Sequence, residues 1–452
     1  MRKLSLATLM AMGLALATSA QAQAADRQAP FQALEEGRFA EALRGAQGAL
    51  ATDPGNPVWW SLAAEAQAGL GAHLEAAHAF ARAAALEPDD ARRSYLKRAQ
   101  AFQLVSASRH DEARAVVRES MADKALATRA SLDWAMVAIA ARDDVSAQDI
   151  LSNEFLYRDF TRQTALDAGY SAKRRGLDAR AVTFFETGLE LDGVEAQPLD
   201  AVTRENIRRE IRELTRDWSF LGQVAYSTAG QSAGFLNTPL SDDRALQIGA
   251  EVSRRIGGWR NGRPFNAFAR IYHSEFLNDD AFVGNATQGW LGVRYKPVST
   301  LNLNLEASRL IGLDSDGIDD WSLRAAISGG EGLEPEAGQR EYLYATYYGD
   351  ISYLTGNDVT FGLAEGRLGY AGLLDDANTT LTPYAVMRLD YDSGRIDETA
   401  LGVGVGVSLR HWFAEGDTVA QRGFVDFDVQ ARERIAGDRR ASSVLATITV
   451  GR

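Results

Sequence analysis

Cysteine is absent from the sequence, and its absence excludes several kinds of chemistry. Disulfide bonds, thiolate metal sites and cysteine nucleophiles all require this residue. The absence also rules out the lipidated N-terminal cysteine that tethers many bacterial envelope proteins to a membrane. A chain of this composition that resides in a membrane must therefore be held there by its own fold.

Positive charge and long apolar runs are scarce as well. Lys and Arg number 48 against 61 Asp and Glu, which gives a formal net charge of −13. Because nucleic acids are bound through basic patches, this balance excludes them as partners. After Ala24 no apolar run reaches the roughly 20 residues that a membrane-spanning helix needs.

The first residues have the pattern of an export signal. Arg2 and Lys3 precede an apolar run from Leu4 to Ala17, and Ala20-Gln-Ala22 offers a small-x-small cleavage site. This pattern predicts a secretory signal peptide over residues 1–24. The alternative, an uncleaved membrane anchor, requires roughly 18 or more apolar residues. We therefore expect a bacterial periplasmic or outer-membrane protein.

From residue 28 to residue 215, apolar residues recur at helical spacing in units of about 34. The characteristic positions of a tetratricopeptide repeat are occupied by Trp60, Ala63, Ala64, Ala76, Phe80, Ala83 and Pro88, and one unit earlier by Ala42, Ala49 and Pro54. These residues predict a tetratricopeptide-like helical solenoid, an architecture that usually binds other proteins. A helical domain without true repeats is the alternative. The charged stretch Thr203 to Asp217 is interpreted as a helix at the junction with the next domain.

Histidines are few, and none has the companions that chemistry needs. His73, His78 and His110 lack acidic or sulfur partners at metal-ligand spacing, so no metal site is expected. His273 precedes Ser274, but adjacent strand residues point to opposite faces, so the histidine does not activate the serine. We expect no enzymatic activity and no cofactor.

From Trp218 to Arg452 the pattern changes to strict alternation of apolar and polar residues. The tract Leu401 to Leu409 is the clearest example, with Leu or Val at every second position and Gly or Ser between them. Candidate strands begin near Ser219, Arg244, Phe265, Thr287, Thr300, Trp321, Glu341, Val359, Thr380, Glu398, Gln421 and Ala441. About 12 strands is an even number, as single-chain bacterial barrels require.

The fold prediction is therefore an α+β multidomain chain. It has an N-terminal α-solenoid of tetratricopeptide-like repeats over residues 28–215, followed by a C-terminal transmembrane antiparallel β-barrel over residues 218–452. A soluble β-sandwich is the alternative. Interfacial girdles are expected from the tryptophans near strand ends, which are Trp218, Trp259, Trp290, Trp321 and Trp412. Long loops are expected over Gly230–Asp243, Leu277–Ala286 and Leu310–Asp320.

Several tracts in the strand half resemble a known family. Arg410-His-Trp-Phe413, Arg422-Gly-Phe-Val-Asp-Phe-Asp428 and Gly258-Trp-Arg-Asn-Gly-Arg-Pro-Phe265 look like the C-terminal domain of NfrA-type bacteriophage adsorption proteins. The resemblance covers roughly Trp218 to the end. It implies an outer-membrane protein with its repeats in the periplasm, which works with an inner-membrane glycosyltransferase to export a surface polysaccharide and in some bacteria serves as a phage receptor. The helical part is shorter than is typical of that family.

The functional expectation is a polysaccharide export channel in the cell outer membrane. The repeats would dock a synthase or another envelope protein, and the barrel, surrounded by outer-membrane lipid, would pass the polymer through a lumen lined with both signs of charge. The predicted polymer path consists of Glu251, Arg270, Arg294, Glu306, Arg324, Arg388, Asp390, Arg410, Asp426, Asp428, Gln430 and Arg432. The rival is a surface receptor or assembly scaffold whose barrel is plugged by salt bridges and transports nothing.

Overall fold

The computed structural model describes residues 28–229, 244–278, 281–315, 317–335, 337–374 and 378–452. The predicted signal peptide and the predicted loop Gly230–Asp243 lie outside these residues. The chain divides into two compact units, Met1–Arg175 and Gly176–Arg452, and each is described by itself.

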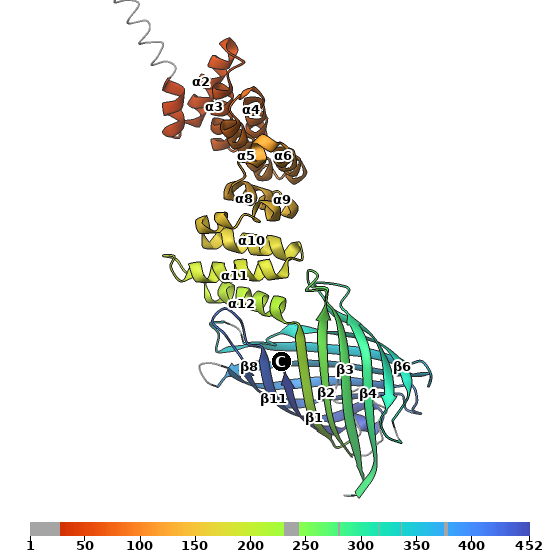
Figure 1. The fold of residues 1–452 in the computed structure, drawn as a ribbon. Coiled ribbons are helices and arrows are strands. Elements are labelled where there is room, and N and C mark those ends of the chain that lie inside the picture. The colour runs from red at the N-terminus through yellow and green to blue at the C-terminus, as the bar shows by residue number, and fades with distance from the viewer. Residues whose placement is uncertain (1–27, 230–243, 279–280, 316, 336, 375–377) are drawn as a thin grey trace, which may run out of the picture. The chain divides into compact units, whose positions relative to one another are not determined.

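The first unit is a series of helices, most of which pack against the next one along the chain (Figure 1). A helical stretch over residues 28–35 comes first. It is followed by α2 (Phe39–Thr52), α3 (Pro57–Gly69), α4 (His73–Leu86), α5 (Asp90–Ser106), α6 (His110–Ala122), α7 (Lys124–Ala127), α8 (Leu132–Ala140), α9 (Asp144–Ile150), the 3-10 turn η1 (Glu154–Asp159) and α10 (Arg162–Arg174). None of the helices in the described residues is long and apolar enough to cross a membrane.

Helices α3 and α4 form the predicted repeat. Asn56 caps α3 by accepting a hydrogen bond from the Val58 backbone N–H, and Pro57 provides a favourable first turn. Their contact consists of small residues that allow close approach, with one aromatic ring between them: Ala63, Ala64, Ala76, Phe80 and Ala83 are all buried. The α-solenoid prediction is confirmed.

The second unit begins with α11 (Asp178–Asp192) and α12 (Ala201–Thr215), and the barrel follows. Helix gives way to strand between Thr215 and Trp218, where the sequence placed the domain boundary. The boundary between the two compact units, however, lies between Arg175 and Gly176, which is 40 residues before the end of α12 at Thr215. The reason is that α11 and α12 contact the barrel and so belong to its unit.

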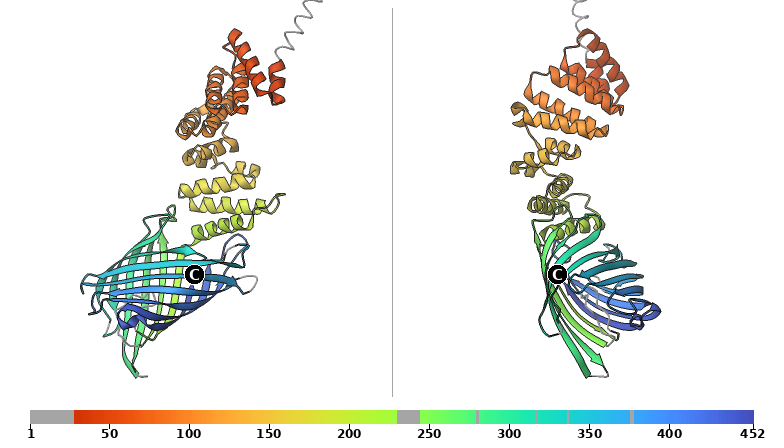
Figure 2. Two further views of the ribbon diagram at one scale, coloured as in Figure 1. Left: turned by 180° about the vertical axis from the view of Figure 1, so that it is seen from behind. Right: turned by 90° about the vertical axis from the view of Figure 1, so that its right-hand side faces the viewer.

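The barrel has the 12 antiparallel strands that the sequence predicted. They are β1 (Trp218–Ser227), β2 (Arg244–Ile256), β3 (Phe265–Asn278), β4 (Ala281–Tyr295), β5 (Asn302–Gly312), β6 (Asp320–Glu331), β7 (Glu341–Leu354), β8 (Val359–Leu373), β9 (Thr379–Asp392), β10 (Thr399–Phe413), β11 (Gly423–Gly437) and β12 (Ser443–Gly451). Each strand pairs with its sequence neighbours, and β1 pairs with β12 to close the ring, Leu221 opposite Gly451. Figure 2 shows the strands running obliquely around the wall.

The predicted loop Leu277–Ala286 is wrong. Strand β4 begins at Ala281, and the β3–β4 ladder continues until Asn278 lies opposite Ala281. Gly284 and Asn285 are turn formers by composition, but continued pairing satisfies the backbone hydrogen-bonding groups of both strands. The loop from β5 to β6 is also shorter than predicted, since β5 continues to Gly312.

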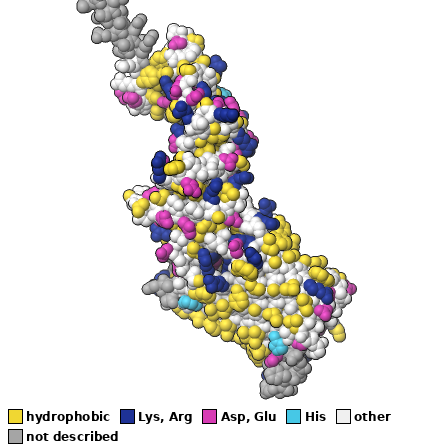
Figure 3. All heavy atoms as spheres, viewed as in Figure 1, with side chains coloured by type: hydrophobic (Ala, Val, Ile, Leu, Met, Phe, Trp, Pro, Cys, Tyr) yellow, Lys and Arg dark blue, Asp and Glu magenta, His cyan; other side chains and the backbone are white. Residues whose placement is uncertain are grey.

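Apolar side chains cover the outer wall, and polar ones point inward. Val405 is 67% exposed and Leu291 is 57% exposed, whereas Asp428 on the inner face is 3% exposed. Figure 3 shows hydrophobic side chains gathered over the barrel surface. A closed barrel with an apolar band outside and charge inside is the architecture of outer-membrane proteins.

The tryptophan prediction is only partly correct. Trp218 and Trp321 are exposed at strand ends, as an interfacial girdle requires, but Trp290 and Trp412 are buried inside the barrel. Both occupy the inward parity of their strands, because they are even-numbered like Arg294 on β4 and Arg410 on β10. Trp290 belongs to an apolar cluster on the inner face with Phe268, Tyr272, Leu310, Leu354 and Phe361.

The acid stability of the first unit is expected to depend on Asp143. This buried carboxylate accepts hydrogen bonds from Arg118 Nε at 3.0 Å and Ser146 Oγ at 2.9 Å. Burial alone would raise the pKa of Asp143, but the hydrogen bonds and charge of Arg118 and the hydrogen bonds of Ser146 hold it below its ordinary value. Since the folded pKa is lower than the unfolded value near about 3.9, the stabilisation is present above that pH and is lost as the pH falls below it.

We predict that Asp143→Asn removes this dependence. The helix content of the full chain is measured by circular dichroism between pH 2 and pH 7, and we call the loss of helix at low pH the acid limb of this curve. The acid limb of the variant is expected to be less steep than that of the unmodified protein. Asp111→Asn, at an exposed position on α6, is the matched control and is expected to leave the limb unchanged. Identical acid limbs for Asp143→Asn and the unmodified protein would contradict the prediction.

Candidate functional site

The inner wall of the barrel carries the residues that the sequence assigned to the polymer path. Their strands place them on one face, and nearly all are buried. They fall into two ion-pair networks and a smaller pair. The first network contains Glu251, Arg270, Arg294, Glu306 and Arg324. The second network contains Arg388, Asp390 and Asp428, and Gln430 and Arg432 lie beside it. The smaller pair consists of Arg410 and Asp426.

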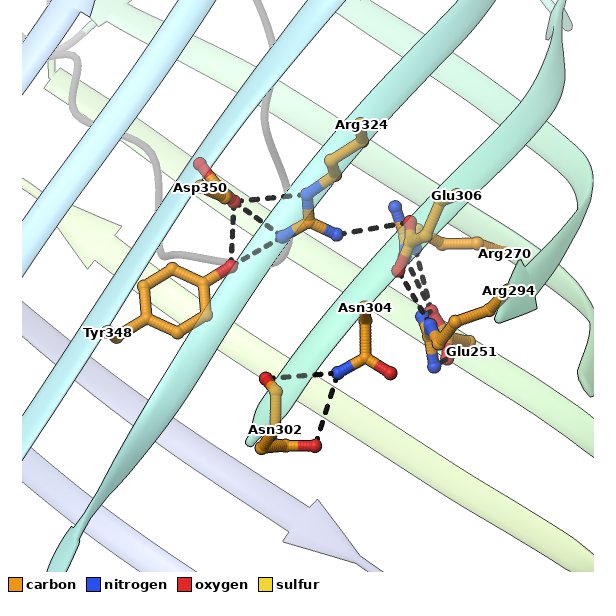
Figure 4. A network of polar contacts seen from close by, with 9 residues as sticks. All are labelled: Glu251, Arg270, Arg294, Asn302, Asn304, Glu306, Arg324, Tyr348 and Asp350. Atoms are coloured by element: carbon orange, nitrogen blue, oxygen red, sulfur yellow. Dashed lines mark hydrogen bonds and ion pairs between the residues drawn. The ribbon is translucent and has the colours of Figure 1, made fainter. Parts of the chain in front are cut away.

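The first network crosses six consecutive strands, β2 to β7 (Figure 4). Arg270 Nη2 lies 2.6 Å from Glu251 Oε2. Arg294 bridges both carboxylates, with Nη1 at 2.9 Å from Glu251 Oε1 and Nε at 2.6 Å from Glu306 Oε1. Arg324 then joins Glu306, at 3.3 Å, to Asp350 on β7, at 3.1 Å. Three guanidiniums thus neutralise three carboxylates along half of the ring.

The second network lies on β8, β9 and β11. Arg367 Nε lies 2.7 Å from Glu365 Oε1, and its Nη1 lies 3.1 Å from Asp428 Oδ2. Arg388 Nη2 lies 2.7 Å from Asp390 Oδ1. Tyr384, also on β9, donates a hydrogen bond of 2.6 Å to Asp428, and its ring lies beneath the Arg367 guanidinium.

Glycine at position 406 is required by this arrangement. A Cβ atom there would lie 2.4 Å from the Tyr384 ring, well inside normal contact. Gly406 of β10 therefore makes room for a side chain of the neighbouring strand β9, whereas a Cβ atom at Gly404 would meet the backbone of Ala431 on β11.

Sequence reasoning missed Tyr348, Asp350, Glu365, Arg367 and Tyr384. Glu365 and Arg367 share their parity with Phe361 and Leu363, so β8 had no consistently polar face. In the structure all four of these β8 residues point inward, since the inner wall of the barrel is partly apolar and partly charged. A charged residue at inward parity was therefore the available signal, even where its neighbours on that face were apolar.

Between the networks the lumen contains a cavity of about 340 Å³. It is lined by carboxylate, guanidinium, amide and aromatic groups, among them Tyr344, Glu365, Arg388, Asp428 and Gln430. Gln430 is 1% exposed, yet both atoms of its amide lack a hydrogen-bond partner among the described residues. A cavity of this size and polarity accommodates a small polar ligand.

Helix α12 lies at the barrel end where β1 begins, which we call the helix-side mouth (Figure 1). Three arginines on α12 bind the loops of this mouth. Arg208 donates to the backbone carbonyls of Gly416 and Val419 at 2.7 Å and 3.2 Å. Arg209 donates to Pro335 O at 2.9 Å, and Arg212 Nη2 lies 2.8 Å from Glu334 Oε1.

The contacts of α12 are spaced around the ring. One set is to the β6–β7 loop, one is to the β10–β11 loop, and a third comes from Arg255 on β2, which donates to the carbonyls of Glu213 and Leu214 at 2.6 Å and 2.8 Å. In the strand order of the closed barrel these positions lie about one third of the circumference apart. A helix held at all three points lies across the mouth.

The guanidinium of Arg212 stays charged where α12 contacts the β6–β7 loop. Burial would lower the pKa of Arg212, but the negative charge of Glu334 and Glu213 raises it above its ordinary value, so the residue is cationic at any physiological pH. The pKa of Arg216 is lowered, chiefly by burial. We name the contacts of Arg208, Arg209 and Arg212 with the two loops the arginine latch.

Comparison with known families gives one match. Residues 279–448 match the family described as "Bacteriophage N adsorption protein A C-term". This match covers β4 to β12 in nearly full length, a narrower range than the resemblance from Trp218 onward, and confirms the family relationship of this part of the chain. With its closed topology and apolar outer wall, the C-terminal domain is an outer-membrane β-barrel. No curated protein matches the chain.

Several solved structures are similar to parts of the chain at low sequence identity. "MamA 41-end from Desulfovibrio magneticus RS-1" covers 38% of this chain and 96% of its own, at 18% identity and a TM-score of 0.30. The "COG4313 outer membrane channel from Pseudomonas putida F1" covers 52% of this chain and 94% of its own, at 10% identity and a TM-score of 0.31. The "transport unit of the autotransporter AIDA-I from Escherichia coli" covers 62% and 97%, at 9% identity and a TM-score of 0.26.

We predict that the first network stabilises the barrel only while it is complete. Arg324→Met would remove the guanidinium that contacts both Glu306 and Asp350, and removal of one member of a buried ion pair costs about 3–5 kcal/mol. Arg309→Met is the matched control, because Arg309 is exposed and lies 4.0 Å from Asp319, a pair worth about 1 kcal/mol or less. Urea unfolding of the barrel in detergent, followed by tryptophan fluorescence, measures both. Equal costs for the two variants would refute the role assigned to the network.

Proposed function

We propose that this protein secretes a surface polysaccharide through its barrel and that the arginine latch closes the channel at rest. In this proposal the helical repeats lie in the periplasm and dock an inner-membrane glycosyltransferase or another envelope protein that delivers the polymer. The observation that carries the proposal is the position of α12 across the mouth of a barrel that contains a polar cavity. In this proposal α12 moves aside when the polymer passes through the barrel and covers the helix-side mouth when it does not.

The composition of the cavity supports a sugar as the passing group. Hydroxyl groups of sugars both donate and accept hydrogen bonds, so they are recognised by carboxylates, amides and guanidiniums together. Asp428, Gln430 and Arg388 supply one of each, while Tyr344 and Tyr348 supply rings against which a sugar face packs. The unpartnered amide of Gln430 is left for such a ligand.

The β6–β7 loop connects the cover to the cavity. Leu333 of this loop lines the cavity, and its backbone carbonyl accepts a hydrogen bond from Arg410 on the inner wall at 3.5 Å. The next residue, Glu334, is held by Arg209 and Arg212 of α12. Movement of α12 away from the mouth would therefore release the loop that limits the cavity on this side.

The rival function is a receptor or assembly scaffold for which the barrel is only an anchor. The two ion-pair networks favour this rival, because side chains that neutralise one another across the lumen also fill it. The matching family is described by phage adsorption, which requires a surface structure but no transport.

Locking the latch separates the two functions. Because the sequence has no cysteine, Arg209→Cys with Pro335→Cys gives a chain in which a bis-methanethiosulfonate, which forms a disulfide with each thiol and releases sulfinate, joins α12 to the β6–β7 loop alone. We predict that the crosslinked protein secretes no polysaccharide above background in cells of its native host and that dithiothreitol restores secretion.

The controls are the two single-cysteine variants treated with the same reagent, which are expected to secrete normally. Undiminished secretion by cells in which nearly all of the protein is crosslinked would contradict the export function. If such cells also adsorbed phage normally, the receptor function would be favoured.

A further inference from the structure

A second cavity, of about 520 Å³, lies at the rim of the helix-side mouth. It is lined by the end of α12, the first residues of β1, Val252 on β2, Arg422 directly before β11, and Arg452. It is separate from the lumen, because Trp218, Phe220 and Val252 occupy the outward parity of their strands. These three apolar side chains are exposed on the surface that faces lipid.

The cavity contains guanidiniums that have no carboxylate partner. Arg216 donates to the backbone carbonyl of Arg422 at 3.5 Å, and Arg422 donates to Thr215 Oγ1 at 3.2 Å. Among the described residues neither forms an ion pair. Of the other charged residues of the lining, Arg212 binds Glu334 and Asp217 binds Arg255, while Arg452 pairs through its backbone with Phe220.

The positive charge of Arg216 is disfavoured by burial and by the neighbouring charges of Arg212 and Arg255, which Glu213 and Glu334 offset only in part. An anion bound at the rim would favour the charged form of this guanidinium. A buried guanidinium is normally compensated by a carboxylate or a phosphate, and arginine binds phosphate oxygens through two parallel hydrogen bonds. The guanidiniums of Arg216 and Arg422 therefore lie at the rim without a carboxylate at ion-pair distance among the described residues.

The apolar side chains next to these cations indicate the rest of the ligand. Trp218 is 59% exposed and lies under the guanidinium of Arg254, 5.3 Å from ring centroid to Arg254 Cζ. Tryptophans and arginines gather at the level of the lipid head groups in membrane proteins. Phe220 and Val252 continue the apolar surface from Trp218 along the barrel wall.

We propose that this cavity binds the head group of an anionic phospholipid, with the phosphodiester between Arg216 and Arg422 and the acyl chains along Trp218, Phe220 and Val252. The bound lipid neutralises the guanidiniums where α12 meets the membrane surface. Its head group thereby joins the junction between α12 and β1 to the start of β11. The site is independent of any polymer in the lumen.

Lipid retention by the full chain tests the site. Protein folded in detergent is mixed with phosphatidylglycerol or with phosphatidylcholine of the same acyl chains, and native mass spectrometry measures the fraction that keeps one lipid. Phosphatidylglycerol is expected to be retained roughly tenfold better, and Arg216→Gln with Arg422→Gln is expected to reduce its retention to the level of phosphatidylcholine. Arg263→Gln, an exposed arginine in the β2–β3 turn, is the control for charge removal and is expected to have no effect.

Two further arms make the outcome decisive. If the double variant loses its heat-modifiable migration on gels, Arg422→Lys replaces it, and an intermediate retention is expected because lysine keeps the charge but loses the paired hydrogen bonds. Free glycerol 3-phosphate in millimolar excess is expected not to displace the lipid. Complete displacement would show a site for phosphate alone and overturn the assignment, as would equal retention of the two lipids or equal retention by the folded double variant and the unmodified protein.

Discussion

Neutralisation of charge inside the barrel is the constraint on which the rest of the structure depends. Twelve strands closed into a ring direct every second side chain into a space with little water, and many of these side chains are charged. A single unpaired charge there is costly, so most of these guanidiniums contact a carboxylate, on another strand or on their own strand, and Arg432 binds Ser443. The ion pairs join the inner faces of β2 to β7 in one network and those of β8, β9 and β11 in another, and they leave the lumen narrow, with a cavity of about 340 Å³.

The same kind of interaction governs the mouth, where its consequence is different. Arg208, Arg209 and Arg212 of α12 meet the acidic residues and backbone carbonyls of two barrel loops, outside the lumen and nearer to water. The arginines of the latch are largely buried, but the carboxylates of Glu334 and Glu415 keep access to water, at 28% and 36% exposed against 0% for Asp350 in the first network. Ion pairs with access to water are weaker than fully buried ones, so this contact holds the cover in place and is released more readily than the networks are rearranged.

The alternation of residues predicted the barrel well, because one side of each strand faces lipid and the other faces its partners. Eleven of the predicted strand starts lie within about two residues of the observed ones, and β4 differs because pairing with β3 overrides the turn formers Gly284 and Asn285. The ion-pair partners were not predictable, since the faces of β8 mix Leu363 with Glu365. Nor was the latch, because Arg212 and Glu334 are 122 positions apart and only the closed ring brings them together.

Conductance across a planar bilayer tests most directly whether α12 closes this barrel. The account predicts that the unmodified protein, inserted and folded, carries no steady current, and that Arg208→Gln, Arg209→Gln and Arg212→Gln together produce discrete channel openings. Arg263→Gln, which removes one positive charge from an exposed turn at the same end, is predicted to stay silent. A steady open conductance in the unmodified protein, or a triple variant as silent as the unmodified protein, would contradict the account.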